Sequence, residues 1–378
     1  MKRLLIICFA VFAYISASAV EFLYNGPYLQ SVTEDSAYIV WLTDKDSEGW
    51  VEVKGKGFKK TIYLSARSGV KLVKRNHKVE ITGLSAGRDY EYKVFAKDPK
   101  SGKTISLATN TKGEKLTFKT LDRNKEEISW IMATDIHYNK HIPNLFQRIF
   151  LPERLEGKDF VIFDGDIADS FSSEKRHFND LFSTITSTFA SNLPYYMARG
   201  NHETRGAAAH RYMDFHPTWT GMPYYAFRHG PVFFIFLDSG EDKPDSDIEY
   251  YGTAAFDEYR RVEGEWLAKV LDSKECKEAA FRIVVNHIPL ASKSWHGGKH
   301  AHAMFSPHLD KADITLMLSG HLHRYSYRKA GRDNKNYPTM IIGADGYLDV
   351  KANSKTLIME RKDLDGNVQH THIFESKK

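Results

Sequence analysis

Short runs in which apolar and polar residues alternate fill the first third of the chain. The runs cover residues 37–43, 50–53, 61–64, 78–81 and 90–94, and turn-forming residues separate them. Alternation with a period of two residues is typical of strands that bury one face, and a series of short strands is typical of a β-sandwich. We therefore predict an all-β sandwich domain over residues 20–121. This segment shows no cluster of titratable residues, so a packing or spacer role is the simpler interpretation.

The pattern changes after the polar stretch 121–127, where strand-like and helix-like segments begin to alternate. Apolar runs predict strands at 129–133, 160–163, 194–198, 232–237, 281–285 and 314–318, with further strands at 339–342, 356–360 and 368–374. Apolar residues at helical spacing predict helices over 174–191 and 254–271. Because strands that alternate with helices are typical of α/β proteins, we predict an α/β domain over residues 127–378.

The first residues have the composition of a secretory signal. Lys2 and Arg3 precede an apolar stretch over residues 4–15, and the small residues 17–19 form a cleavage site. The apolar stretch is too short to span a bilayer, and no other segment is apolar enough to do so. We predict a signal peptide over residues 1–19 and a secreted or periplasmic protein. An uncleaved N-terminal anchor is the alternative.

The net charge argues against a nucleic-acid partner, and the cysteine content argues against disulfide bonds. The formal net charge of the chain is +5, and its basic residues form no run, so we expect no nucleic-acid-binding patch. After removal of the signal only Cys276 would remain, which excludes an internal disulfide. The stability of an exported protein without disulfides rests on its core and on any metal that it binds.

Five predicted strands of the second domain end in side chains that can bind metal ions. They are Asp135 and His137, Asp166 and Asp169, Asn201 and His202, His287, and His321 and His323. Open α/β sheets bind their ligands at the carboxyl ends of the strands. Carboxylate, imidazole and amide groups without thiolate suit Zn, Mn, Fe or Co. The set is large enough for two ions that share one carboxylate.

The same blocks, in the same order, resemble those of the calcineurin-like metallophosphoesterases. They read Asp135-x-His137, Gly165-Asp166-x-x-Asp169, Gly200-Asn201-His202-Glu203, Asn286-His287 and Gly320-His321-x-His323, and they span about residues 128–325. Residues 82–90 resemble a corner of fibronectin type III domains. The order of a β-sandwich followed by this catalytic core is similar to that of purple acid phosphatases. Those enzymes carry a tyrosine where this chain has Asp169. We therefore expect a colourless protein, nearer to the non-purple members.

The resemblance implies a fold, a metal site and roles for single residues. The fold is an αββα sandwich, which is a two-layer β core flanked by helices. It follows the N-terminal β-sandwich in the chain. One ion would be held by Asp135, His137, Asp166 and His323, and the other by Asp166, Asn201, His287 and His321. His202 would protonate the leaving group, and the carboxylate of Asp169 would orient His202. Glu203 would support the site without binding metal.

A dinuclear site of this kind suits phosphoester hydrolysis. Two cations about 4 Å apart hold a bridging hydroxide for in-line attack and neutralise the charge that develops on the phosphoryl group. A positioned imidazole that protonates the leaving alkoxide contributes about 100-fold or more. We expect a small-molecule phosphomonoester as the substrate. The alternatives are a phosphodiesterase or nucleotidase with the same site, a metallo-hydrolase acting on another bond, and a non-catalytic surface-binding protein.

Three further positions are candidates for substrate contacts. Arg205 and His210 follow the third block, and His296 belongs to a histidine-rich stretch, residues 292–308, that we interpret as a loop over the cavity. An exposed loop without function is the alternative. The acidic and aromatic segment 241–251 either shapes the substrate side of the site or is a solvated loop.

Overall fold

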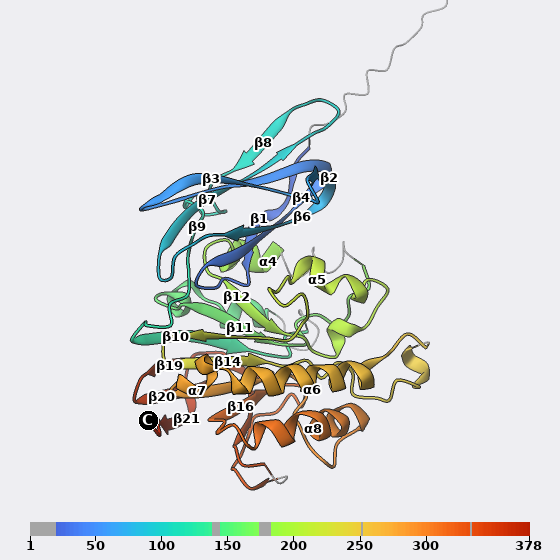
Figure 1. Ribbon diagram of the computed structural model, residues 1–378, viewed down its shortest axis with the longest axis vertical. Coiled ribbons are helices and arrows are strands. Elements are labelled where there is room, and N and C mark those ends of the chain that lie inside the picture. The colour runs from blue at the N-terminus through green and yellow to red at the C-terminus, as the bar shows by residue number, and fades with distance from the viewer. Residues whose placement is uncertain (1–19, 138–143, 174–182, 251, 333–334) are drawn as a thin grey trace, which may run out of the picture.

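The computed structural model describes residues 20–137, 144–173, 183–250, 252–332 and 335–378. Figure 1 shows a mixed α/β chain with a β-rich part at one end and its longest helices towards the other. The expected signal segment, residues 1–19, lies outside the described residues. Within the described ranges, no helix is long and apolar enough to cross a membrane.

The N-terminal part of the chain consists of strands. They are β1 (Phe22–Gln30), β2 (Ser36–Gly55), β3 (Phe58–Leu64), β4 (Ala66–Arg67), β5 (Val70–Lys71), β6 (Val73–Thr82), β7 (Asp89–Lys97), β8 (Thr104–Leu107) and β9 (Thr117–Lys119). In β7 every second side chain is buried, beginning with Tyr90 and Tyr92, as the alternation of its sequence predicts. These residues share one core with Trp41 and Phe118. The expected N-terminal β-sandwich is confirmed, whereas its boundary with the second domain stays a prediction.

The first sheet of the second part is built on parallel strands. β10 (Glu127–Ala133), β11 (Phe160–Asp164) and β12 (Tyr195–Ala198) lie side by side, with Met132 opposite Ile162 and Ile162 opposite Tyr196. The antiparallel strands β19 (Gly346–Asn353), β20 (Thr356–Asp363) and β21 (Val368–Glu375) extend the sheet beyond β10. At the other edge β1 pairs with β12 through Gln30 and Tyr195, so the sheet continues into the N-terminal sandwich.

The second sheet has its own set of parallel strands. Its order is β13 (Tyr225–His229), β14 (Val232–Phe236), β15 (Phe281–Val285), β16 (Leu316–Ser319), β18 (Thr339–Ile341) and β17 (Ser326–Arg328). Neighbours from β14 to β18 run parallel, and the strands at both edges run antiparallel to them. All five residues of β14 and of β15 are buried, which explains why their sequences are continuously apolar rather than alternating.

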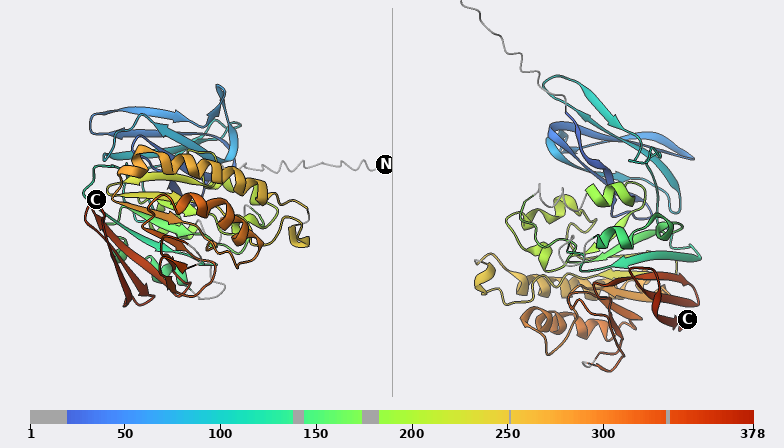
Figure 2. Two further views of the ribbon diagram at one scale, coloured as in Figure 1. Left: turned by 60° about the horizontal axis from the view of Figure 1, so that its bottom comes forward. Right: turned by 180° about the vertical axis from the view of Figure 1, so that it is seen from behind.

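The two sheets pack face to face, and helices cover their outer faces. Trp130 and Phe160 from the first sheet meet Phe234 and Leu316 from the second in one core. Helices α1 (Leu145–Ile149), α4 (Ser183–Ile185) with η2 (Thr186–Ala190), and α5 (Tyr212–Phe215) pack on the first sheet. Helices α6 (Phe256–Asp272), α7 (Lys274–Glu278) and α8 (His296–Leu309) pack on the second, as Figure 2 shows. The predicted αββα class is therefore confirmed.

The long helices agree in part with the prediction. The expected helix over 254–271 is α6, and the expected helix over 174–191 is seen only from residue 183 onward because residues 174–182 lie outside the described residues. Within the described ranges, the remaining turns of helix are α2 (Pro152–Leu155), η3 (His202–Thr204), η4 (Ala209–Arg211) and η5 (Ile248–Tyr250).

The interpretation of residues 292–308 as a loop is wrong, because most of the stretch forms α8. Its two glycines are sites of close packing rather than of chain reversal. A Cβ atom on Gly297 would lie 1.9 Å from the main-chain oxygen of Glu241, and one on Gly298 would lie 2.6 Å from the hydroxyl of Ser294. Glycine is the residue that permits such an approach of one backbone to another group.

Candidate metal centre

The five blocks follow the carboxyl ends of five strands, where the two sheets meet. Asp135 and His137 follow β10, Asp166 and Asp169 follow β11, and Asn201 and His202 follow β12 in the first sheet; His287 follows β15, and His321 and His323 follow β16 in the second. The ligand atoms of Asp135, His137 and His323 lie within 4.8 Å of one another, and those of Asp166, His287 and His321 do as well. The fold thus brings all the expected ligand positions to one place and divides most of them into two groups.

Asp166 lies between the two groups. Its Oδ2 atom is 3.0 Å from Nε2 of His287 in one group and 3.8 Å from Nε2 of His137 in the other. The carboxylate is buried, and its Oδ1 accepts a hydrogen bond of 2.9 Å from the main-chain N–H of His202. This position between the groups is the one that a bridging carboxylate requires.

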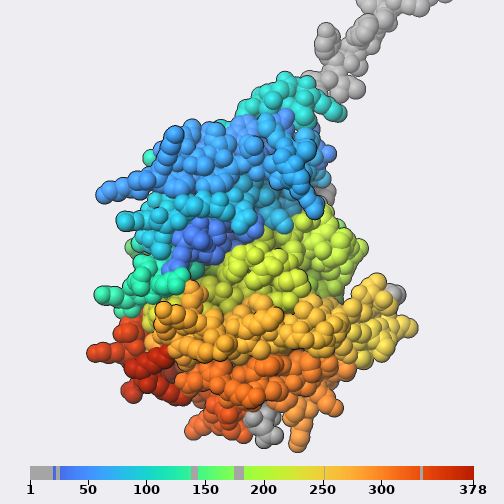
Figure 3. Space-filling model, in the orientation of Figure 1, coloured from blue at the N-terminus to red at the C-terminus, as the bar shows by residue number. Residues whose placement is uncertain are grey.

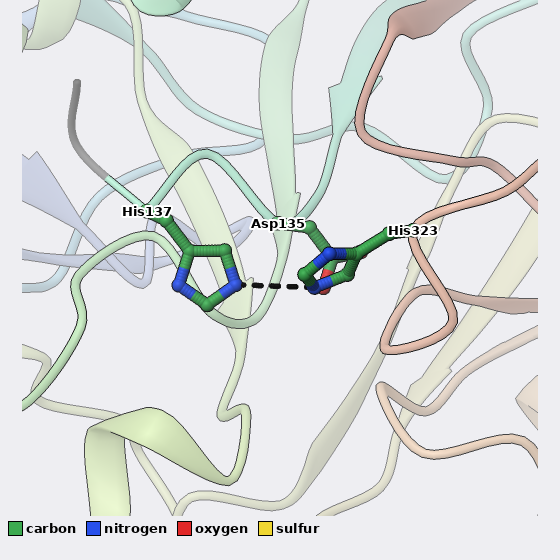
Figure 4. A group of neighbouring side chains, drawn as sticks. All are labelled: Asp135, His137 and His323. Carbon is green, nitrogen blue, oxygen red and sulfur yellow. Dashed lines mark hydrogen bonds and ion pairs between the residues drawn. The ribbon is translucent and has the colours of Figure 1, made fainter. Parts of the chain in front are cut away.

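The first group combines one carboxylate with two imidazoles. Nε2 of His323 lies 3.3 Å from Oδ1 of Asp135 and 3.3 Å from Nε2 of His137. Figure 4 shows the two rings turned towards each other with Asp135 beside them. Asp135 also receives the main-chain N–H of His321, at 3.0 and 3.1 Å, which connects the loop after β10 to the loop after β16. In the second group Nδ1 of His321 lies 3.0 Å from Oδ1 of Asn201.

His287 tests whether these residues fit a metal ion. Its Nδ1 lies 2.5 Å from the main-chain oxygen of Asp164, which can only accept, so Nδ1 carries the proton. In the neutral ring Nε2 then has a lone pair, yet it is buried without a hydrogen-bond partner and faces the carboxylate of Asp166. A lone pair and a carboxylate oxygen 3.0 Å apart repel each other unless a proton or a metal ion lies between or beside them. Metal-binding histidines commonly donate their second N–H to a main-chain oxygen in this way, so the residues fit the expected ions.

The pKa shifts of His287 and Asp166 show that this cluster also favours a positive charge next to its carboxylates. Burial would lower the pKa of His287, but Asp166 and Asp135 raise it well above its usual value. Burial would raise the pKa of Asp166, but His287 holds it well below its usual value. Burial, reinforced by His287, lowers the pKa of His321 to about 4, so this imidazole is neutral at pH 7 and has a lone pair for a metal ion.

Glu203 holds two of the strand-end loops together. Its carboxylate accepts hydrogen bonds of 2.8–3.2 Å from the main-chain N–H groups of Asp166, Ile167 and Ala168, and one of 2.9 Å from Gly200. A Cβ atom on Gly200 would lie 2.3 Å from Oδ1 of Asp166, so only glycine lets the loops approach this closely. This geometry supports the expectation that Glu203 stabilises the site without binding an ion.

His202 lies beside the cluster, with Nε2 3.9 Å from Oδ2 of Asp166. The carboxylate of Asp169 lies close to both His137 and His202, because the ligand atoms of these three residues are within 4.8 Å of one another. That carboxylate lies 3.0 Å from Nδ1 of His137, and the main-chain oxygen of Asp169 lies 2.8 Å from Nδ1 of His202. Asp169 therefore orients His202 through its main chain, while its side chain supports the expected ligand His137.

The three candidates for substrate contacts have different surroundings. Arg205 lies beside the centre, with Nη1 3.3 Å from Nε2 of His202. His210 lines a cavity that begins at Arg205. His296 is the first residue of α8, and its Nε2 pairs with the carboxylate of Asp257 on α6, at 2.8 Å from Oδ1. The structure thus brings Arg205 to the centre but pairs His296 with a residue on the outer helices.

Two acidic residues at the site were not singled out from the sequence. Oδ2 of Asp242 lies 3.9 Å from Nε2 of His321, and burial raises the pKa of this carboxyl group. Glu241 is 1% exposed and binds Arg205 with both carboxylate oxygens, at 2.7 and 2.9 Å. The only signal in the sequence was their position in the acidic segment 241–251, which an exposed loop would also explain.

The comparisons with known proteins agree with this geometry. The model of the calcineurin-like phosphoesterase family matches residues 131–325, which is more than half of the chain. The chain therefore belongs to the calcineurin-like phosphoesterase family. The matched residues contain every expected metal ligand.

Individual relatives are distant. The chain is 28% identical to mouse "Serine/threonine-protein phosphatase CPPED1" over 41% of this chain and 48% of that protein. It is 24% identical to Arabidopsis thaliana "Purple acid phosphatase 18" over 47% of this chain and 40% of that protein, so it spans less than half the length of either curated relative. The solved structure of purple acid phosphatase PPD1 from yellow lupin seeds matches 92% of this chain and 74% of that chain, with a TM-score of 0.67 and 17% identity. This likeness extends the shared fold to the N-terminal sandwich.

Proposed function

We propose that the protein is an exported, metal-dependent phosphoester hydrolase that acts on phosphomonoesters at a dinuclear centre. The observation that carries this proposal is the position of Asp166 between two groups of ligand atoms that come from four strand ends. One ion would be held by Asp135, His137, Asp166 and His323, and the other by Asp166, Asn201, His287 and His321. Zn, Mn and Fe all suit such nitrogen and oxygen ligands.

The side chains around the centre would have different roles in hydrolysis. When bound, two ions supply an activated water and neutralise the phosphoryl charge. His202 presents Nε2 towards Asp166 because its Nδ1 is engaged by the main-chain oxygen of Asp169. This nitrogen is the one that protonates the leaving alcohol. Nη1 of Arg205 lies 3.3 Å from the same nitrogen and donates to it only while His202 is neutral. When His202 is protonated for its role as the acid, this N–H of Arg205 is available to a phosphoryl oxygen of the bound substrate.

Two parts of the proposal rest on the sequence. Export follows from the composition of residues 1–19, which predicts a cleaved secretory signal. A small-molecule substrate is favoured because the chain lacks a run of basic residues that would bind a nucleic acid.

Metal content and hydrolysis, measured together, test the proposal. We expect the purified protein to carry about two transition-metal ions per chain and to hydrolyse p-nitrophenyl phosphate faster than bis-p-nitrophenyl phosphate. Asp166→Asn should lose metal and activity together for both substrates. Asp313→Asn is the matched control, because Asp313 has the same left-handed backbone conformation (φ 51°, against 52° for Asp166) but a half-exposed side chain away from the ligand set. A faster reaction with the diester would point to a phosphodiesterase, and activity in protein with one ion or none would refute the dinuclear centre.

A further inference from the structure

A large cavity opens next to the candidate metal centre. It has a volume of about 720 Å³, and its walls include Arg205, His210, Tyr250, Ala254 and Phe256. Cavities of roughly 300–1,000 Å³ accommodate whole small molecules, so a phosphate group alone would leave most of this space empty. The walls come from the segment after Glu203 and from the segment between β14 and α6, which extends beyond the N-terminal end of α6 in Figure 1.

Arg205 connects the wall of the cavity to the centre. This side chain lines the cavity, and its Nη1 atom lies 3.3 Å from Nε2 of His202. The same Nε2 atom lies 3.9 Å from Oδ2 of Asp166. A phosphoryl group bound at Asp166, with its ester oxygen towards His202, would therefore direct its alcohol past Arg205 into the cavity.

The wall formed by residues 241–250 is preorganised rather than a solvated loop. Besides Arg205, the carboxylate of Glu241 accepts hydrogen bonds from the hydroxyl groups of Thr204, at 3.0 Å, and Tyr250, at 3.1 Å. The buried guanidinium of Arg260 binds the main-chain oxygens of Ser239 and Glu241. Because these groups are already satisfied within the protein, little ordering is needed when a ligand enters the cavity.

The charged groups on the described walls are paired with one another or with neighbours. Arg205 pairs with Glu241, and Nη2 of Arg199 lies 2.6 Å from Asp238. Glu249 pairs with Lys243. Such pairs leave no excess of either sign to attract a charged ligand. The remaining wall is formed by the rings of Tyr250 and Phe256, by small side chains such as Ala207, Ala209 and Ala254, and by the polar side chains of Thr204, His210 and Thr253.

We propose that this cavity is the subsite for the leaving alcohol and that it selects a bulky, uncharged alcohol with an aromatic or apolar face. The inference rests on the proposed function, because the subsite has a role only if the neighbouring centre hydrolyses phosphoesters. Burial of an apolar group in a subsite next to the reacting bond contributes to kcat/KM when the contact is kept in the transition state. The cavity, rather than the metal centre, then decides which monoester is the preferred substrate.

Alkyl phosphates of different size separate binding from leaving-group chemistry. Ethyl phosphate and phenylpropyl phosphate release alcohols of similar basicity, so their difference in kcat/KM reports the contact with the cavity. We expect the wild-type protein to favour phenylpropyl phosphate by about 10- to 100-fold, the range that apolar contacts provide in enzyme specificity. We also expect phenylpropanol, but not propanol, to inhibit the reaction competitively.

Filling the cavity should remove this preference. In Ala254→Trp the ratio of the two kcat/KM values should fall by about 10-fold or more, because the indole ring occupies the subsite. Ile248→Trp is the matched control, because Ile248 lies on the same segment with 85% of its surface exposed. It adds the same ring outside the cavity and should leave the ratio unchanged. Should Ala254→Trp fold poorly, Ala207→Trp places the ring on the part of the wall that follows Glu203 in the chain.

The outcomes distinguish the two proposals. Equal kcat/KM values for the two alkyl phosphates, or an unchanged ratio in the folded cavity variants, would overturn the leaving-group subsite while leaving the hydrolase intact. No turnover of any phosphoester by protein that carries its metal would overturn the proposed function, and the subsite with it. Inhibition by phenylpropanol that persists in Ala254→Trp would show that the alcohol binds elsewhere.

Discussion

Five of the expected metal ligands have a left-handed backbone conformation. Their φ angles are 52° for Asp135, 43° for His137, 52° for Asp166, 66° for His321 and 55° for His323. Residues other than glycine adopt this conformation at a cost of about 1–3 kcal/mol each and do so mainly where function requires it. Each of these angles lies in the segment that follows a strand end, where the expected ligands gather. This concentration of strained residues supports a site built to bind a ligand.

His202 is expected to act on the leaving group rather than on the metal. In His202→Ala both ions should remain, and the rate should fall by about 100-fold or more for alkyl phosphates but least for p-nitrophenyl phosphate, whose leaving group needs little protonation. The measurement is kcat/KM against leaving-group pKa, with the metal content determined beside it. An equal loss for all substrates, or loss of metal, would show that the role assigned to His202 is wrong.

Asp169→Asn is the companion variant. Since the carboxylate of Asp169 lies 3.0 Å from Nδ1 of His137 and the main-chain oxygen of Asp169 lies 2.8 Å from Nδ1 of His202, the substitution should weaken metal binding. It should leave the dependence on the leaving group as it is in the wild type. A loss that grows with leaving-group pKa would instead favour direct orientation of His202 by this carboxylate.

At the scale of elements, the centre depends on loops that follow different strands. Glu203, after β12, receives main-chain N–H groups from the segment after β11, and Asp135, after β10, receives one from the segment after β16. These contacts fix the relative positions of strand ends that are far apart in the sequence. A buried carboxylate with several donors is well suited to this role, because each bond to a charged acceptor is stronger than a neutral one.

Glu203→Gln should therefore loosen the centre without removing a ligand. An amide group would turn a donor towards the N–H groups of the loop, which should cost about 1–3 kcal/mol of unfolding free energy. Metal affinity should fall by about 10- to 100-fold, as is usual when a supporting contact is lost. Urea unfolding and metal competition measure the two effects. Glu258→Gln, on the exposed face of α6, is the control and should change neither.

At the scale of the whole molecule, the N-terminal sandwich and the αββα part form one packed unit. Tyr28, Val40 and Leu42 from the sandwich belong to the same core as Phe163 and Tyr195 from the first sheet. Figure 3 shows the N-terminal residues lying directly against the residues coloured yellow-green. Because the core is shared, we expect heat to unfold the described parts in a single transition.

A buried hydrogen bond between the two parts provides the test. The hydroxyl of Tyr92 donates to the main-chain oxygen of Ser191 at 2.6 Å. Tyr92→Phe leaves that oxygen without this donor and should lower the unfolding free energy by about 1–3 kcal/mol, still in one transition. Tyr63→Phe removes a hydroxyl bonded to Thr82 within the sandwich at an exposed position and should change stability by less than about 0.5 kcal/mol. Two separate transitions in calorimetry would contradict the shared unit.

The class of fold and the identity of the expected ligands were accessible from the sequence alone. Alternation in the first third of the chain, apolar runs such as β14 and β15, and polar residues placed directly after them all depend on neighbours within a few positions. Local spacing records such features because a strand shows its burial in its own residues. The same reasoning failed at residues 292–308, which were interpreted as a loop but mostly form α8, where Gly297 and Gly298 make close contacts with Glu241 and Ser294.

Tertiary structure alone decided how these residues work together. The partner of Asp169, the pairing of Arg205 with Glu241, and the cavity behind Arg205 all join residues separated by about 30 or more positions of the chain. No periodicity encodes such pairs, because they arise only when the two sheets pack and their strand ends face one another. The sequence by itself therefore determined which chemical groups are present and on which elements they lie. The packing of the sheets determined which groups touch, and with that the candidate centre and the cavity beside it.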